Sequence, residues 1–253
     1  MPKPSPKWNR KETLAAFNLY CRMPFRKVNA RNKTIIALAS RLGRTPAALS
    51  MKMSNLAWHD PNNPSSLKRG SKLDAEIWAQ FFADPDAVIF ESEQAVAFYE
   101  KRAVESPVEV DGDMQIPPGR ERTQQTRVRV GQAFFRRAVL AAYQEQCCIT
   151  GLAVPDLLNA SHIIPWRENR ERVNPSNGLC LNALHDRAFD RGLITVSATG
   201  IVEVSAELMT CAPTGDAHRF LTDSHGAKIQ MPDKFKPTAE FLDYHNREIF
   251  LGR

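Results

Sequence analysis

Charge is distributed very unevenly along this 253-residue chain. Residues 1–72 hold 15 lysines and arginines against two acidic residues, whereas residues 73–118 hold two basic and 11 acidic residues. The remainder, 119–253, has 17 basic and 15 acidic side chains. A short segment with a net charge of +13 repels itself on folding unless a polyanion compensates it. This predicts nucleic acid as the first partner and an acidic membrane surface as the second; a solvated basic face is the simpler alternative.

Composition and hydropathy indicate a soluble globular protein. Hydrophobic residues make up 43% of the chain and charged residues 25%, which is typical of globular domains. No apolar run approaches the roughly 18–20 residues that span a bilayer, and the N-terminal MPKPSPKW has no apolar segment behind it as a signal peptide would. Five cysteines are too few and too irregularly spaced for a disulfide framework. We therefore expect a soluble, cytoplasmic protein with no membrane contact.

The first part of the chain has the pattern of a small helical DNA-binding domain. Apolar residues at helical spacing predict helices over about 9–22, 33–42 and 46–58. Gly43 ends the second of these, and Thr45 followed by proline is a typical helix start. Two short helices joined by a tight turn are the layout of a helix-turn-helix, whose second helix enters a major groove of DNA. Any three-helix bundle with a basic surface has the same pattern, so that alternative stays open.

A segment rich in proline and glycine divides the chain. Residues 106–119 carry three prolines and two glycines without periodicity. We therefore predict a helix-turn-helix or winged-helix-like domain over 1–105, a linker over 106–119 and a second domain over 120–253. Because the second domain also shows short strands, the fold class is α+β. Its first residues are rich in arginine, which either lines a groove for a nucleic-acid backbone or covers a solvated helix face.

Within the second domain, a compact strand–loop–strand–helix unit carries the chemistry. Residues 157–164 and 178–181 are apolar enough for strands, and residues 182–191 form a helix that ends at Gly192. His162 stands at the end of the first strand, where its side chain is expected to project into a cleft. A neutral imidazole is a competent general base near pH 7.

The motifs of this unit resemble those of the HNH endonucleases, the ββα-metal or His-Me finger nucleases. The resemblance is carried by A-S-H-I-I-P-W at 160–166, N-P-x-N-G-L at 174–179 and F-D-R-G-L at 189–193, and it covers roughly residues 130–205. It implies a ββα-metal fold and a nuclease that uses a divalent cation to hydrolyse phosphodiester bonds of double-stranded DNA.

The resemblance also assigns roles to residues. His162 becomes the general base, and Asn177 braces the loop through an amide that can donate and accept at once. The family's cation-binding position on the helix falls on Asp186, nine residues after Asn177, with His185 beside it. A carboxylate suits Mg²⁺ or Mn²⁺, whereas imidazole suits softer metals. Asp186 is therefore the favoured metal ligand, and His185 is kept as an alternate ligand or a catalytic partner that faces the phosphate.

Two features depart from patterns found in the family. Ser161 stands where many members carry an aspartate or histidine as a second metal ligand, and a hydroxyl is a weak ligand. The paired CxxC motifs of a zinc ribbon are also missing, since Cys147 and Cys148 are adjacent while Cys180 and Cys211 stand alone. We expect these cysteines to be small buried hydrophobes and expect no structural zinc.

Together these patterns predict a nuclease with a separate DNA-reading domain. A small nuclease core contacts mainly the DNA backbone, which carries little sequence information. We therefore expect the N-terminal domain to select a sequence or a methylated site, in restriction or defence, and expect a homodimer if both strands are cut together. The alternatives are a DNA-binding regulator with an inactive HNH-like domain and, less favoured, a nuclease that acts on RNA. The residues expected to contact DNA are Arg44, Thr45, Ser50, Lys52, Ser54, Asn55, Arg127, Arg129 and Arg167.

Overall fold

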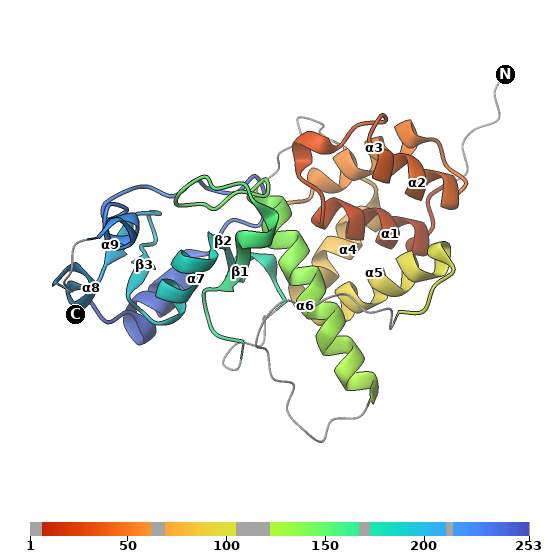
Figure 1. Ribbon diagram of the computed structural model, residues 1–253. Coiled ribbons are helices and arrows are strands. Elements are labelled where there is room, and N and C mark those ends of the chain that lie inside the picture. Colours follow the sequence, from red (N-terminus) through yellow and green to blue (C-terminus); the bar gives the residue numbers. More distant parts are fainter. Residues whose placement is uncertain (1–6, 62–68, 105–121, 167–172, 211–214, 253) are drawn as a thin grey trace. The chain divides into compact units, whose positions relative to one another are not determined.

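The chain folds into two compact units in the computed structural model (Figure 1). The units are Met1–Phe134 and Phe135–Arg253, so the boundary between them falls inside the long helix α6 (Arg122–Ala142). The predicted linker, 106–119, lies outside the described residues and stays a prediction. The structure describes residues 7–61, 69–104, 122–166, 173–210 and 215–252.

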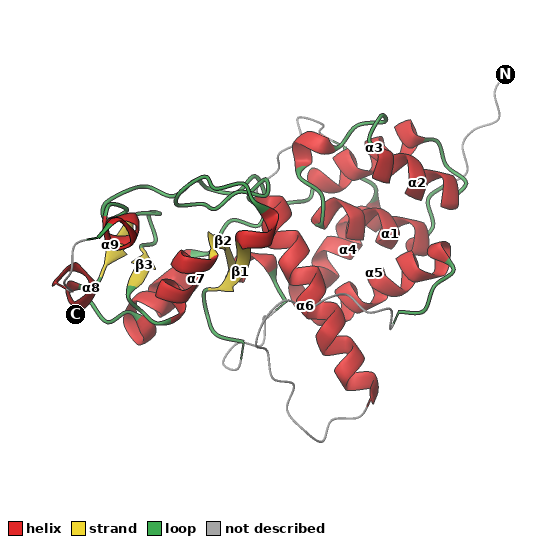
Figure 2. Ribbon diagram, in the orientation of Figure 1, coloured by secondary structure: helices red, strands yellow, loops and turns green. Residues whose placement is uncertain are grey.

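Helices build the first unit (Figure 2). The bounds of the first three α-helices agree with those predicted from the sequence to within one or two residues. The acidic region folds into two further helices. The described residues of this unit contain no strand; residues 62–68, where a wing would fall, are outside them. The elements are α1 (Arg10–Cys21), η1 (Phe25–Lys27), α2 (Lys33–Arg41), α3 (Pro46–Ala57), α4 (Lys72–Ala83) and α5 (Pro85–Glu100).

Side-chain caps determine where these helices begin. Asn9 and Ser71 form capping boxes with Glu12 and Asp74 at the starts of α1 and α4. Thr45 accepts a hydrogen bond from the third amide of α3, as the sequence predicts. Each cap satisfies an amide that has no partner within its helix and contributes about 1 kcal/mol.

Aromatic rings fill the centre of the first unit. The Phe17 ring on α1 is fully buried, and its edge contacts are with Trp78 at 5.1 Å and Phe81 at 5.4 Å between ring centroids. The Trp78 indole N–H donates to the carbonyl of Leu56 at 2.8 Å. One aromatic cluster therefore joins α1, α3 and α4.

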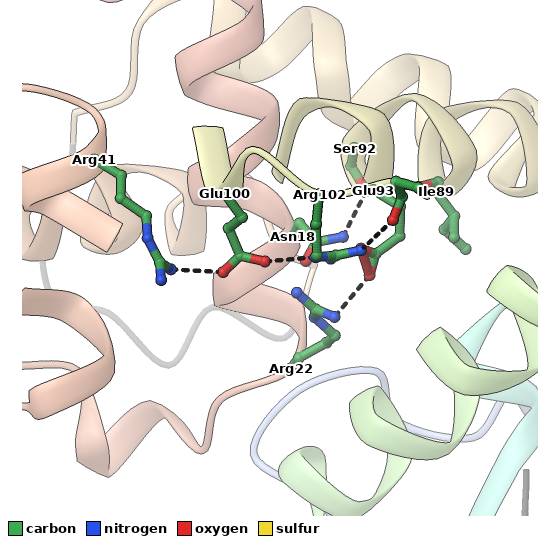
Figure 3. Close-up of polar contacts among 9 residues, drawn as sticks. Asn18, Arg22, Arg41, Ile89, Ser92, Glu93, Glu100 and Arg102 are labelled. Carbon is green, nitrogen blue, oxygen red and sulfur yellow. Dashed lines mark hydrogen bonds and ion pairs between the residues drawn. The ribbon is translucent and has the colours of Figure 1, made fainter. Parts of the chain in front are cut away.

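Ion pairs connect the basic and the acidic segments of the first unit. Figure 3 shows one alternating network, in which Arg41 pairs with Glu100, Arg102 bridges Glu100 and Glu93, and Glu93 also pairs with Arg22. The opposite net charges of residues 1–72 and 73–118 are thus partly neutralised within the unit, without a polyanion. Among the described residues, the pairs that join a cation of residues 1–72 to a carboxylate of residues 73–118 are Arg10–Glu91, Arg22–Glu93, Arg41–Glu100 and Lys52–Asp74.

Two residues expected to contact DNA hold their charges inside the unit instead. The Lys52 ammonium lies 2.8 Å from the Asp74 carboxylate, and both side chains are buried. The Arg44 guanidinium pairs with Glu12 at 2.8 Å and, like Lys52, lies against the Trp8 ring. The expectation that Lys52 contacts DNA does not fit this burial, because a carboxylate of α4 holds its charge inside the unit.

The second unit contains two small antiparallel sheets, which together with its helices fit the α+β class (Figure 2). In the first sheet, His162 lies opposite Gly178 and Leu158 lies opposite Asn182. The second sheet is a hairpin in which Ile194 lies opposite Val204 and Val196 lies opposite Val202. The helices α8 and α9 follow it and are not predicted from the sequence. The elements are β1 (Leu158–His162), β2 (Gly178–Asn182), α7 (Ala183–Asp190), β3 (Ile194–Val196), β4 (Val202–Val204), α8 (Ala206–Thr210), α9 (Asp216–Thr222), α10 (Ala239–Tyr244) and the π turn η4 (His245–Ile249).

The second half of α6 packs in this unit. Phe135, Ala138, Val139 and Ala142 are buried at helical spacing, so this part of α6 is a core element, although the sequence left open a groove or a solvated face. No helix in the described part of the chain is long and apolar enough to cross a membrane.

Replacement of Lys52 tests the buried ion pair. Lys52→Met leaves the Asp74 carboxylate buried without its counter-charge, so we expect the free energy of unfolding to fall by about 3 kcal/mol. Urea unfolding followed by circular dichroism measures this. Lys33→Met removes an exposed cation at the start of α2 and is the control, with an expected change under about 0.5 kcal/mol. Equal free energies of unfolding for the Lys52 variant and wild type would show that the Lys52–Asp74 pair does not contribute to stability.

Candidate active site

The β1–β2 hairpin presents His162 at the edge of the second unit. His162 is the last residue of β1, and its side chain is half-buried. The imidazole lies face to face with the Phe135 ring of α6, with 3.8 Å between centroids and 10° between planes. The Trp166 ring approaches it edge-on at 5.4 Å. These two ring contacts hold His162 in one orientation.

Asn177 ties together the two ends of the loop between the strands. Its Oδ1 accepts from the Ile164 amide at 2.9 Å, and its Nδ2 donates to the Ile164 carbonyl at 3.0 Å. The Ile163 amide donates in turn to the Asn177 carbonyl at 2.9 Å. The Asn177 side chain is fully buried, so these bonds form in a low-dielectric environment where they are strong. This is the bridging of backbone groups that an amide at this position is expected to provide.

Oxygen-bearing side chains gather around Asp186 in the first turn of α7. The Ser161 hydroxyl donates to one carboxylate oxygen of Asp186, and the Asn159 amide donates to the other at 2.6 Å. Asn159 and Ser161 lie two residues apart on β1 and therefore on one face of the strand. Asn159 was not identified from the sequence; its period-two spacing from Ser161 is the signal that would have found it.

This group fits a hard divalent cation. A carboxylate, a hydroxyl and an amide that can turn its oxygen inward are the oxygen ligands that Mg²⁺ and Mn²⁺ prefer. Within the described residues, no three or more histidine, cysteine, aspartate or glutamate side chains are grouped to hold a metal. The carboxylate in this group is that of Asp186, and the remaining ligands would come from neutral groups, water and substrate.

His185 differs from its expected place. Its side chain is fully buried, with Nδ1 2.9 Å from the Asn182 amide nitrogen and the Phe220 ring 5.0 Å away. Burial lowers the pKa of His185 to about 4, so the imidazole is neutral near pH 7. Because neighbouring helix positions point about 100° apart, His185 faces inward while Asp186 faces the β1 polar groups. We therefore remove His185 from the candidate catalytic and metal-binding residues.

The cysteines of this unit are interior residues. Cys147, Cys148 and Cys180 are buried free thiols, and the Cys148 amide donates to the Cys180 carbonyl at 2.8 Å. Burial raises the pKa of Cys180 to about 12 and that of Cys148 well above its usual range, so both remain protonated. Cys211 lies outside the described residues.

The other residues expected to contact DNA fall into three groups. Ser50, Ser54 and Asn55 are half-buried on α3, and Thr45 is exposed at its start. Exposed positions on α6 are occupied by Arg127 and Arg129, and Arg167 lies outside the described residues.

Comparison with known proteins supports a nuclease. Residues 147–197 match the family model described as HNH endonuclease, and this range contains His162, Asn177 and Asp186. The match supports the HNH family for this part of the second unit. An HNH endonuclease domain implies DNA as its substrate, and HNH nucleases generally use a divalent metal. The search of curated proteins finds no significant match to the chain.

Acid is expected to destabilise the second unit through its buried imidazoles. Burial lowers the pKa of both His185 and His245 to about 4, below the ordinary value of 6.5. Between these pH values the unfolded chain binds more protons than the folded one, so stability is complete above pH 6.5 and falls as the pH drops toward 4. We expect a loss on the order of 2 kcal/mol for each histidine.

Urea unfolding at pH 7.5 and at pH 5 measures this loss. The double variant His185→Asn/His245→Gln is expected to unfold with a shallower pH dependence, and His225→Gln, at an exposed position, is the control. Identical slopes for all three proteins would contradict the role of the buried imidazoles.

Proposed function

We propose that this protein is a divalent-metal-dependent DNA endonuclease that hydrolyses phosphodiester bonds. The observation that carries the proposal is the arrangement in the segment matched by the HNH model. A half-exposed histidine ends β1, and the same strand presents a hydroxyl and an amide to a carboxylate on α7. A base and an oxygen-rich cation site on one small hairpin are what phosphodiester hydrolysis requires.

Each residue has a distinct task in this proposal. His162 accepts the proton of the attacking water, and its ring contacts hold the accepting nitrogen toward the substrate. Asp186 would hold the cation, with the Ser161 hydroxyl and the Asn159 amide oxygen as neutral ligands beside it. A bound cation supplies Lewis-acid stabilisation of the charge on the scissile phosphate. Asn177 acts on none of the reacting atoms, and keeps the loop after His162 in place.

The first unit is proposed to select the DNA. Its support is the pair of short helices α2 and α3 with a tight turn between them, and the polar side chains of Thr45, Ser50, Ser54 and Asn55. With Arg44 and Lys52 engaged in ion pairs, phosphate contacts fall to exposed cations such as Lys33, Arg127 and Arg129. We infer the selection of a sequence or a methylated base, in restriction or defence, from the combination of a DNA-binding unit and a nuclease unit in one chain. No contact to a base enters this inference. A homodimer is proposed where both strands are cut together.

The second candidate function is a DNA-binding regulator whose HNH-like domain is inactive. Ser161 favours it, because a hydroxyl in place of an acidic ligand weakens the hold on a cation. A regulator binds DNA with salt-dependent affinity and leaves the phosphodiester bonds intact.

Plasmid cleavage distinguishes the two functions. We expect wild type to cut plasmid DNA with Mg²⁺ or Mn²⁺, and His162→Ala to lose at least about a hundredfold in rate, because it lacks the base. Adenine-methylated, cytosine-methylated and unmodified plasmids in parallel report what the first unit selects. Salt-sensitive binding without cleavage of any plasmid would reject the endonuclease in favour of the regulator.

Metal dependence tests the cation site. In Asp186→Asn we expect the Mn²⁺ concentration for half-maximal cleavage to rise at least about tenfold, because the site loses its only carboxylate among the described neighbours. Asp190→Asn removes the same charge one turn further along α7 and is expected to change that concentration far less. If both variants respond alike, Asp186 acts through its charge alone and does not bind the cation.

A further inference from the structure

A residue outside the matched HNH segment contacts the candidate base. Phe135 belongs to α6, whereas the family match begins at residue 147. Its ring covers one face of the His162 imidazole at 3.8 Å. We propose that Phe135 is a positioning residue for His162, so that the catalytic unit includes the second half of α6. This inference rests on the proposed function, in which His162 is the base.

Helix α6 is attached to both strands of the hairpin that carries His162. The Arg136 guanidinium donates to the Leu158 carbonyl at 2.8 Å, at the start of β1. The Tyr143 hydroxyl lies 3.4 Å from the Gly178 carbonyl, at the start of β2. These two polar contacts, from the residue after Phe135 and from the residue that follows the end of α6, therefore hold this part of the helix against the hairpin.

Gly178 makes room for this contact. It lies opposite His162 in the sheet register. A Cβ atom at Gly178 would lie 2.4 Å from Val139 Cγ2 and 2.9 Å from Phe135 Cζ, closer than real Cβ contacts allow. The absence of a side chain at this position lets α6 approach the strand closely enough for Phe135 to reach the imidazole.

His245 makes a similar ring stack that serves structure alone. The His245 ring also lies against a phenylalanine, Phe189, with 3.7 Å between centroids and 12° between planes. However, His245 is fully buried and both of its ring nitrogens are engaged inside the unit, by Thr195 and by the Phe189 carbonyl. His162 has the same ring contact but is half-exposed. The stack on Phe135 therefore fixes the plane of an imidazole that is half-buried, whereas His245 is fully buried.

A fixed ring plane matters for a general base. Proton transfer requires the accepting nitrogen to point at the water within hydrogen-bonding reach, and a misplacement near 1 Å costs up to about a hundredfold in rate. An aliphatic side chain fills space beside the imidazole but does not select a ring plane. Loss of the Phe135 ring is thus expected to slow the chemical step and to leave DNA binding unchanged.

Paired phenylalanine variants of the full-length protein test the proposal. Phe135→Leu is expected to lower the single-turnover cleavage rate about tenfold, with an unchanged dissociation constant for DNA measured without divalent metal. Phe134→Leu, at an equally buried neighbouring position, is the matched control and should cleave near the wild-type rate. Phe135→Met replaces Phe135→Leu if the leucine variant does not fold, because methionine adapts to an irregular space.

A spectroscopic measurement reads the contact independently of cleavage. In protein carrying ¹³C-labelled histidine, the ring protons of His162, assigned by their absence in His162→Gln, are expected upfield because they lie over an aromatic face. Phe135→Leu should move them downfield, and Phe134→Leu should not. This signal is obtained even if wild type cuts no DNA, so failure of the proposed function is separable from failure of the positioning.

Three outcomes would overturn the proposal. The first is wild-type cleavage by Phe135→Leu, and the second is an equal loss of rate in both phenylalanine variants, which would indicate stability alone. The third is a His162 signal without the upfield shift. The expected result is a selective tenfold loss together with the selective change of the His162 signal.

Discussion

A buried asparagine holds the geometry of the candidate site. Both polar atoms of the Asn177 amide bond to one residue, Ile164, so the loop that leaves β1 returns to β2 at a set separation. Helix α7 follows β2 directly, and Asn182 caps its start. The places of His162 and Asp186 therefore both depend on this bridge. A buried amide is suited to this task because leaving either polar atom without a partner would cost 1–3 kcal/mol, roughly.

In the first unit, ion pairs between helices have the positioning role that Asn177 has in the second unit. Its basic helices are covered by carboxylates that come largely from α4 and α5, and the most enclosed of these pairs is Lys52–Asp74. A buried ion pair adds little net stability, but removal of one partner lowers the free energy of unfolding strongly. Such pairs therefore determine which helices pack against each other. The cations left exposed, such as Lys33, are those available to a polyanion.

Local signals in the sequence were sufficient for most elements. Caps such as Thr45, glycine stops such as Gly43 and apolar spacing located the first helices, and the hairpin and α7 were located by the same means. The same signals were insufficient for α8 and α9, which are short. They also could not reveal Phe135 as a neighbour of His162, since that contact requires α6 to lie on the hairpin and Gly178 to admit it.

The sequence by itself determined the order of the motifs, the helix boundaries and the residue types at the candidate site, because these depend on neighbours within a few positions along the chain. The tertiary structure decided which polar side chains are enclosed and which stay accessible. It placed His185 and Lys52 inside and left His162 half-buried. Burial arises from elements far apart in the sequence, and the cost of enclosing a charged or polar group depends on the partner that it finds there.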